Sequence, residues 1–228
     1  MRFPGPLVSA VFLGRPNRFL GEIMVGGKES QCFIPNPGRM EELLYPGAEV
    51  YLLEKRSETR KTAYNLVLVD LGGTLISVDS FTPNRVVNES IERATIPEFS
   101  GLQVEKPEYT FGESRLDFLL SSGSELLFLE VKSCTLVRDG VALFPDAPTI
   151  RGRRHLDTLV EGLSLGRAAV FFLIQRSDAE LFRPNEGTDP AFADKLRSAH
   201  RQGVEVYAYS SKVTLEGVFL DHRVPVEL

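Results

Sequence analysis

Two neighbouring apolar segments carry two carboxylates and an amine whose spacing suits chemistry on a phosphodiester. Asp117 lies in the first segment, and Glu130 and Lys132 lie in the second. Between the segments, Gly123 and Ser124 form a favoured two-residue hairpin turn, in which Gly supplies the positive φ. With these two residues in the loop, Asp117 is predicted to lie directly opposite Glu130.

Side chains alternate between the faces of a strand, so this register also predicts two different faces. The expected charged face carries Arg115, Asp117, Leu119, Phe128, Glu130 and Lys132, with Arg115 opposite Lys132. The other face is wholly apolar and is expected to be core; it carries Leu116, Phe118, Leu120, Leu127, Leu129 and Val131.

Opposed carboxylates repel each other, because their Cβ atoms lie only about 4.5–5.5 Å apart. A divalent cation between Asp117 and Glu130 removes that penalty, and Mg²⁺ favours one or two carboxylates with waters and substrate phosphate. Lys132, on the face of Glu130, can orient or help to deprotonate an attacking water, or offset charge on the phosphate. The alternative is an exposed strand end where these charges form a surface ladder of salt bridges.

Length and composition describe an ordinary globular chain. It has 228 residues, of which 43% are hydrophobic and 25% charged, with a formal net charge of −5. These values exclude a disordered tail, a disulfide miniprotein and an integral membrane protein. Any nucleic acid must therefore be bound by a local basic patch. Cys32 and Cys134 form no CxxC pair, which argues against a zinc cluster and a secreted framework, so we expect a cytoplasmic protein.

The first 80 residues predict a small β-barrel. Apolar or alternating segments broken by Gly and Pro predict strands at Leu7–Leu13, Arg18–Val25, Gln31–Ile34, Glu49–Glu54, Ala63–Asp70 and Thr74–Val78. A short helix is expected at Met40–Leu44, ended by Pro46 and Gly47. About five strands with one helix after the third is the order of an OB-like barrel; another small barrel or half a sandwich is the alternative.

The pattern changes near Thr82, where helices begin to alternate with strands. Helices are predicted from Asn84, as the cap, to about Ala94, from about Arg153 to Gly166, and at Pro190–Gln202. Strands are predicted at Arg115–Leu120, Glu125–Ser133, Ala168–Ile174 and Val204–Tyr209. This interleaving predicts an α/β domain, so we expect domains at residues 1–82 and 83–228.

A series of motifs runs along almost the whole chain. Among them are Asn36–Arg39, Ser114–Asp117, Glu130–Ser133, Phe144–Ala147 and Phe171–Arg176. As a set they resemble the sugar fermentation stimulation protein A family. The usual family form of the first motif is Asn-Thr-Gly; here Pro37 replaces Thr, which stiffens the loop and removes a hydroxyl group.

The resemblance implies an N-terminal OB-like β-barrel that binds nucleic acid. It implies a C-terminal α/β domain of the PD-(D/E)XK nuclease-like type with a mixed central sheet, and DNA as a partner. The pattern then assigns catalysis to Asp117, Glu130 and Lys132, and Mg²⁺ or Mn²⁺ to Asp117, Glu130 and the carbonyl of Val131. Glu89 would be the upstream acid of that superfamily, or merely a solvated charge on a helix. Gln175 would hydrogen-bond near the site, or merely end a strand.

Basic residues at two further places suit phosphate contacts. Arg151, Arg153, Arg154 and His155 lead into a predicted helix, where cations oppose the helix dipole and so need another reason to be present. His155 has an ordinary place at the edge of the core as its alternative. Arg39 lies in a Pro/Gly loop that would flank the groove of an OB-like barrel, and Arg115 belongs to the charged face.

Three functions follow from these features. The first is a DNA-binding protein with a metal-dependent phosphodiesterase site, that is, an endonuclease. The second is a non-catalytic DNA-binding regulator of sugar (maltose) metabolism on a nuclease scaffold. The third is a protein-interaction or sugar-responsive module without nucleic acid. RNA as a substrate, and a homodimer as the assembly, are left open.

Overall fold

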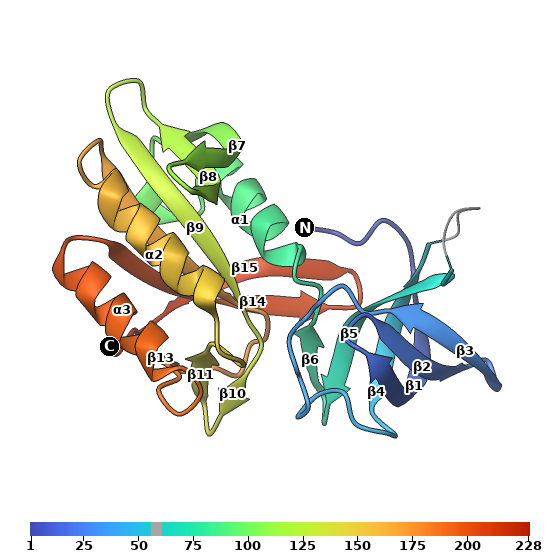
Figure 1. Cartoon of the computed structure of the whole chain (residues 1–228). Helices are drawn as coiled ribbons and strands as arrows, with labels where there is room; N and C mark the ends of the chain where they lie inside the picture. The colour runs from blue at the N-terminus through green and yellow to red at the C-terminus, as the bar shows by residue number, and fades with distance from the viewer. Residues whose placement is uncertain (56–60) are drawn as a thin grey trace.

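Five strands of the N-terminal domain close into a barrel. The computed structural model describes residues 1–55 and 61–228, and Figure 1 shows the barrel beside a larger domain that contains the helices. The strands of the ring are β1 (Leu7–Asn17), β2 (Leu20–Val25), β3 (Lys28–Phe33), β4 (Glu49–Glu54) and β5 (Tyr64–Leu71), and β6 (Thr74–Ser77) pairs with β5 outside it. They pair in the order β3-β2-β1-β4-β5-β6, and a parallel pairing of β3 with β5 closes the barrel. The OB-like prediction is confirmed.

The helix expected at Met40–Leu44 is only a single turn. The amides of Leu43 and Leu44 donate to the carbonyl of Met40 at 3.0 and 2.8 Å, and no regular helix follows. Met40 has a left-handed φ of 50°, which a right-handed helix cannot accommodate. Met40 and Leu43 are nevertheless buried in the barrel core, so the apolar spacing reflects packing rather than a helix.

The C-terminal domain is a mixed sheet between helices. Its helices are α1 (Thr82–Glu92), α2 (Ile150–Gly162) and α3 (Pro190–Arg201), with a 3₁₀ turn at Pro97–Phe99. Its strands are β7 (Gln103–Phe111), β8 (Ser114–Ser121), β9 (Leu126–Cys134), β10 (Val137–Arg138), β11 (Val141–Phe144), β12 (Arg167–Ile174), β13 (Leu181–Pro184), β14 (Glu205–Thr214) and β15 (Gly217–Val224).

The main sheet has the order β15-β14-β12-β9-β8-β7, and β10-β11-β13 form a small second sheet. Strands β9, β12 and β14 are parallel, whereas the outer strands are antiparallel. The predicted mixed central sheet is thus confirmed. The sequence pattern missed β10, β11, β13 and β15 as well as β7. Strand β7 lies at the sheet edge, is mostly exposed and contains Pro107, so it lacks the apolar run of an inner strand.

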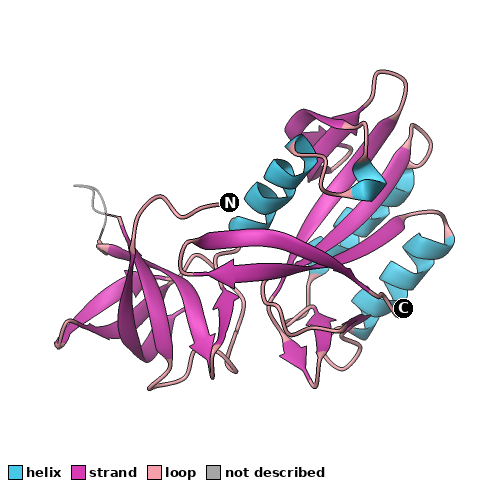
Figure 2. Cartoon of the chain, turned by 180° about the vertical axis from the view of Figure 1, so that it is seen from behind, coloured by secondary structure: helices cyan, strands magenta, loops and turns pink. Residues whose placement is uncertain are grey.

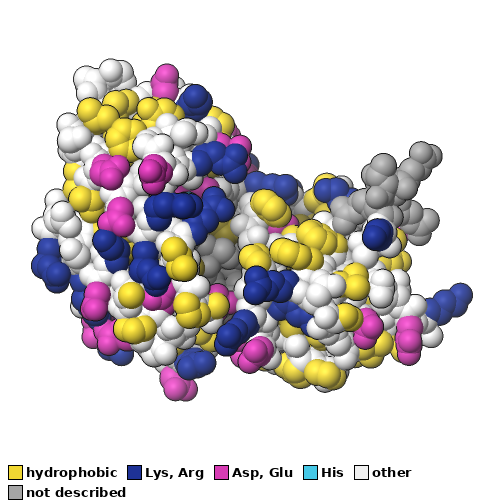
Figure 3. Space-filling view, in the orientation of Figure 1, with side chains coloured by type: hydrophobic (Ala, Val, Ile, Leu, Met, Phe, Trp, Pro, Cys, Tyr) yellow, Lys and Arg dark blue, Asp and Glu magenta, His cyan; other side chains and the backbone are white. Residues whose placement is uncertain are grey.

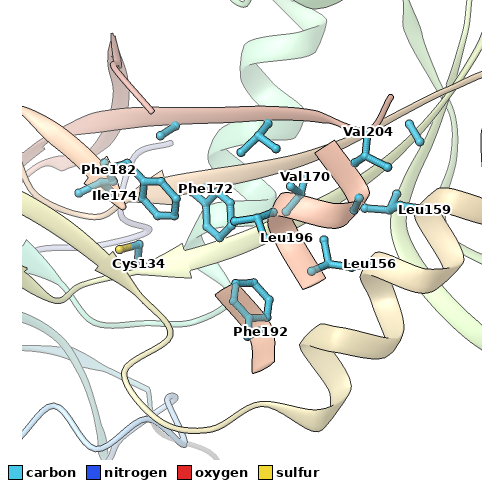
Figure 4. Packing of buried hydrophobic residues seen from close by; sticks show 14 of the residues in the cluster. Cys134, Leu156, Leu159, Val170, Phe172, Ile174, Phe182, Phe192, Leu196 and Val204 are labelled. Carbon is cyan, nitrogen blue, oxygen red and sulfur yellow. The ribbon is translucent and has the colours of Figure 1, made fainter. Parts of the chain in front are cut away.

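Helices cover both faces of the main sheet, with α1 on one side and α2 and α3 on the other (Figures 1 and 2). The continuous apolar run of β12 follows from this burial on both faces. Figure 4 shows the cluster on the α2 and α3 side. The Phe172 ring stacks on Phe182 with centroids 4.2 Å apart, and Phe192 and Leu196 of α3 complete the packing. Among the described helices, none is long and apolar enough to span a membrane.

Side-chain caps start α2 and α3 but not α1. Thr149 accepts a hydrogen bond from the amide of Gly152, and Asp189 accepts one from the amide of Phe192. Helix α1 follows Phe81 without a side-chain cap, so the expectation that Asn84 caps it is wrong. The Asn84 side chain is used in the site described below.

Gln175 links the two domains at the end of β12. Its backbone amide donates to the carbonyl of Cys134 at 2.8 Å, and its carbonyl accepts from the amide of Ser77 in the barrel at 2.9 Å. Its side-chain oxygen accepts from the Ser77 hydroxyl at 2.8 Å, and its side-chain nitrogen donates to the Ser133 hydroxyl at 2.9 Å. The residue is completely buried. Residues at the N-terminus also join the second domain, because Arg2 pairs with Gly217.

We expect Gln175→Ala to lower the free energy of unfolding by about 1–3 kcal/mol, because the buried Ser77 hydroxyl and the half-buried Ser133 hydroxyl lose their partner. Urea unfolding followed by circular dichroism measures this change. Gln202→Ala, at an exposed position after α3, is the control and should change the value by less than about 0.5 kcal/mol. Equal stability of the two variants would show that the link between the domains does not depend on this side chain.

Candidate active site

The hairpin of β8 and β9 has the predicted register. Gly123 has a positive φ of 83°, and the amide of Ser122 donates to the carbonyl of Glu125 at 3.0 Å. Phe118 pairs with Leu129, and the pairs continue through Ser121 with Leu126. Both faces are buried, however, which corrects the expectation of one open charged face. Leu116, Leu119 and Phe128 belong to the apolar cluster on the α2 and α3 side, and Glu130 is only 3% exposed.

The ladder between β8 and β9 ends at the pair Phe118 and Leu129, so Asp117 lies just outside it. In the ladder, the next carbonyl of β8 to meet β9 would be that of Leu116, facing the amide of Val131. Instead, that amide donates to Asp117 Oδ2 at 2.8 Å. Asp117 Oδ1 accepts from Asn84 Nδ2 at 2.6 Å, in the first turn of α1. The carboxylate is therefore held by a strand and a helix in one fixed orientation.

This separation overturns the expected pairing of Arg115 with Lys132. Arg115 pairs with Thr110 of β7 instead, and its exposed guanidinium lies 3.5 Å from Glu108. Once β8 has left β9, the side chain of Arg115 no longer faces β9. We therefore leave Arg115 out of the proposed nucleic-acid contacts.

Glu130 lies at the centre of a buried polar cluster between β9 and α2. Its Oε1 accepts from Lys132 Nζ at 2.6 Å and forms a very short contact with His155 Nδ1. Arg151 Nε donates to His155 Nε2 at 3.2 Å. Because Nε2 accepts, Nδ1 must carry the proton, and a neutral imidazole donates to Glu130. Lys132 Nζ lies 3.3 Å from the same Nδ1, and in this tautomer that contact is not a hydrogen bond.

His155 is thus a buried support for Glu130 and not a phosphate contact. Its side chain is 3% exposed, so the expectation that it touches nucleic acid is wrong. The alternative prediction, a histidine at the edge of the core, describes its position. Its hydrogen bonds with Glu130 and Arg151 hold the Glu130 carboxylate in place.

The two carboxylates differ in their proton affinity. Burial raises the pKa of Asp117 to about 6, and the negative charge of Glu130 adds to the rise. For Glu130, burial also acts to raise the pKa, but Lys132 and His155 outweigh it and hold the pKa below its ordinary value. Near neutral pH, Glu130 is ionised and Asp117 is close to its titration range.

One oxygen of Glu130 is available to bind a divalent cation. Glu130 Oε2 is buried and has no hydrogen-bond partner among the described residues, although an unpaired carboxylate oxygen is costly there. In residues 1–55 and 61–228, no group of three or more His, Cys, Asp or Glu side chains is placed to hold a metal. The protein donors would be two carboxylates and the Val131 carbonyl, completed by water, which is a set that suits Mg²⁺ or Mn²⁺.

Lys132 faces a cleft of about 960 Å³ between the domains. The barrel contributes Arg15, Arg18 and Arg39 to its walls, and the second domain contributes the segment from Phe144 to Thr149. Figure 3 shows Lys and Arg side chains on both sides of the hollow between the domains. An acidic chain therefore presents a local basic surface next to the Glu130 cluster.

The motif Asn36–Arg39 forms the wall of this cleft on the barrel side. The guanidinium of Arg15 donates to the carbonyls of Asn36 and Gly38 at 2.9 and 2.8 Å, and the amide of Arg39 donates to Asp146 of the other domain at 3.1 Å. A Cβ on Gly38 would lie 2.6 Å from Asp146 Oδ2, so a side chain here would displace the carboxylate that accepts from the Arg39 amide. These contacts leave the exposed Arg39 side chain at the cleft.

Two other predicted residues, Glu89 and Arg153, have partners outside the site. Glu89 pairs with the Met1 amino group and with Arg93, each at 2.6 Å, and we do not include it in the site. Arg153 donates two hydrogen bonds to Asp189 at 2.8 and 2.9 Å. It therefore joins α2 to the start of α3, and we do not propose it as a phosphate contact. Arg154 is exposed on α2 and stays a proposed contact.

Sequence reasoning missed Asn84, Arg15 and Asp146 as parts of this region. The sequence predicts a helix cap at Asn84, whereas in the structure Asn84 is the third residue of α1 and its side chain donates to Asp117. Arg15 and Asp146 act on backbone groups of a distant loop, which no local spacing indicates.

The fold and the cleft define a class of protein in which an OB barrel is joined to an α/β domain with a mixed central sheet. The family model "SfsA N-terminal OB domain" matches residues 13–78, and "Sugar fermentation stimulation protein RE domain" matches residues 81–217. The chain belongs to the sugar fermentation stimulation protein family, as its motifs suggested.

Relatives of similar length support the assignment. A sugar fermentation stimulation protein homolog of Moorella thermoacetica is 47% identical over 231 residues, covering 100% of both chains. A homolog of Caldanaerobacter subterraneus is 43% identical over 229 residues, again covering 100% of both chains. The solved structure of Pyrococcus furiosus SfsA in complex with Ca²⁺ is 31% identical, with a TM-score of 0.93, and the match covers 100% of this chain and 98% of that one.

We expect the pKa of Asp117, about 6 in the folded protein, to fall in Glu130→Gln, because the like charge is removed. Carbon-detected NMR titration of the carboxyl group measures both values. Since the folded pKa lies above the ordinary value of 3.8, ionisation of Asp117 destabilises the fold progressively as pH rises from about 4 to about 6. An Asp117 pKa that is unchanged in the variant would contradict the coupling of the two carboxylates.

Proposed function

We propose that the protein binds DNA in the cleft between its domains and hydrolyses phosphodiester bonds there with a divalent cation. The observation that carries the proposal is the buried, unpaired oxygen of Glu130, beside Asp117 and behind the Lys132 amine that faces an arginine-lined cleft. The Ca²⁺ named for the Pyrococcus furiosus relative agrees with a cation site in this family.

Each residue of the cluster has a separate task in this proposal. Asp117, Glu130 and the Val131 carbonyl would hold Mg²⁺ or Mn²⁺, which when bound offsets the charge that develops on the phosphate. Lys132 holds an attacking water in line with the phosphorus atom, and its ammonium group faces the phosphate oxygens. Asn84 and the amide of Val131 keep Asp117 in place.

The arginines of the barrel and of α2 would bind the strand on either side of the scissile bond. Arg18 and Arg39 are exposed at the cleft, and Arg151 and Arg154 lie on the exposed side of the first turns of α2. Guanidinium groups bind phosphate oxygens in a bidentate manner, which positions the backbone without reading the sequence.

We expect Glu130→Ala to weaken Mn²⁺ binding at least about tenfold, whereas Lys132→Ala retains it and loses cleavage by about 100-fold. Calorimetry measures metal binding. Cleavage is measured on supercoiled, linear, single-stranded and branched DNA and on RNA, with Mn²⁺, Mg²⁺ or chelator. Glu92→Ala, on the exposed end of α1, is the matched control.

Two outcomes of this experiment would contradict parts of the proposal. If Glu130→Ala binds Mn²⁺ as wild type does, the cation site is wrong. If the wild-type protein binds DNA with no cleavage under any metal condition, the second function, a non-catalytic regulator on a nuclease scaffold, takes its place.

We expect Arg18→Ala to weaken duplex DNA binding and to lower the slope of log affinity against log salt by about 1, the value for one lost phosphate contact. Fluorescence anisotropy over a range of salt concentrations, in the presence of chelator, measures the slope. Arg201→Ala, at the exposed end of α3 and away from the cleft, should leave it unchanged. The same slope in all three proteins would rule out the barrel wall as the DNA contact.

A further inference from the structure

A pair of stacked aromatic rings, of which Phe19 is exposed and Phe33 is half-buried, lies on the barrel beside the cleft. Phe19, in the turn between β1 and β2, stacks on Phe33 at the end of β3, with ring centroids 6.2 Å apart and planes at 18°. Phe19 is 47% exposed, which is unusual for so large an apolar side chain. The rings border a cavity of about 540 Å³, lined by Asn17, Phe19, Leu20, Phe33, Lys61 and Thr62.

This cavity adjoins the basic cleft. Asn17 lines both of them, and the next residue, Arg18, lines the cleft while Phe19 lines the aromatic cavity. One short turn therefore presents a cation toward the cleft and a ring toward the cavity. Lys61 also lines the aromatic cavity and supplies a second positive charge.

The turn is held in place by backbone hydrogen bonds, so the ring pair is organised in advance. The amide of Phe19 donates to Asn17 Oδ1 at 2.9 Å, and its carbonyl accepts from the amide of Ile34 at 2.9 Å. The carbonyl of Arg18 accepts from the Arg15 guanidinium at 2.7 Å, the same group that holds the Asn36–Arg39 loop. A rigid aromatic surface binds a planar ligand with little loss of side-chain freedom.

We infer that Phe19 and Phe33 form a stacking platform for unpaired bases, and that the substrate carries a single-stranded segment next to the bond that is cut. Base faces in a duplex are covered by their neighbours, so only an unpaired base can stack on an exposed ring. Arg18 and Lys61 would bind the phosphates on either side of that base. The inference rests on the proposed function, because it extends the path of the strand from Lys132 through the cleft onto the barrel.

The test uses the full-length protein with chelator present, so that no cleavage occurs. The probes are a dodecamer of thymidine that contains one 2-aminopurine and a blunt duplex of the same length. We expect the wild-type protein to quench the aminopurine on binding. Phe19→Ala should weaken binding of the single strand about tenfold and that of the blunt duplex by less than about twofold.

Two further variants separate stacking from general apolar contact. Phe19→Tyr keeps an aromatic ring and should bind the single strand as wild type does, whereas Phe19→Leu should behave as Phe19→Ala. Leu215→Ala, 49% exposed at the turn between β14 and β15, is the control of matched exposure and should change nothing.

Full single-strand binding by Phe19→Ala, an equal loss on the blunt duplex, or an aminopurine that is not quenched would overturn the inference. So would a wild-type dimer that Phe19→Ala converts to monomer in sedimentation, because the rings would then contact a second copy. Metal-dependent cleavage is scored separately. Binding that depends on Phe19 without any cleavage contradicts the proposed nuclease alone, and cleavage with binding independent of Phe19 contradicts this inference alone.

Discussion

The burial of one carboxylate, that of Glu130, determines the arrangement of its surroundings. An ionised group that is 3% exposed needs compensation, and β9 and α2 supply it through Lys132 and His155. Arg151 fixes the histidine tautomer that can donate to Glu130. These contacts fix the position of Glu130 through Oε1. The other oxygen, Oε2, has no hydrogen-bond partner among the described residues, so part of the negative charge is not compensated.

The hairpin of β8 and β9 opens next to this cluster. If β8 continued along β9, the amide of Val131 would be paired with a backbone carbonyl. Because the strands part, Asp117 accepts that hydrogen bond instead, and α1 contributes Asn84 to its other oxygen. Two like charges are thereby held near each other at the open end of a rigid hairpin, and the raised pKa of Asp117 is the electrostatic consequence.

The position of the barrel gives this cluster a surface on which a polymer can lie. Buried hydrogen bonds of Gln175 fix the barrel against the end of β12, and Asp146 reaches the loop that carries Arg39. Residues about a hundred positions apart thus form the two walls of one cleft. A rigid connection between the domains is what would let the arginines of the barrel and Lys132 act on the same strand.

The sequence by itself determined the elements with strong local signals: the hairpin register from Gly123, the helices of the C-terminal domain from their apolar spacing, the buried β12 from its continuous apolar run, and the family from its ordered motifs. The tertiary structure decided what depends on distant partners. In the structure, Glu89 pairs with the Met1 amino group and Arg153 binds Asp189. His155 is buried against Glu130, and Arg115 pairs with β7 instead of lying opposite Lys132. Periodicity reports which side of an element is apolar, whereas the partner of a charged group depends on which other element covers that side.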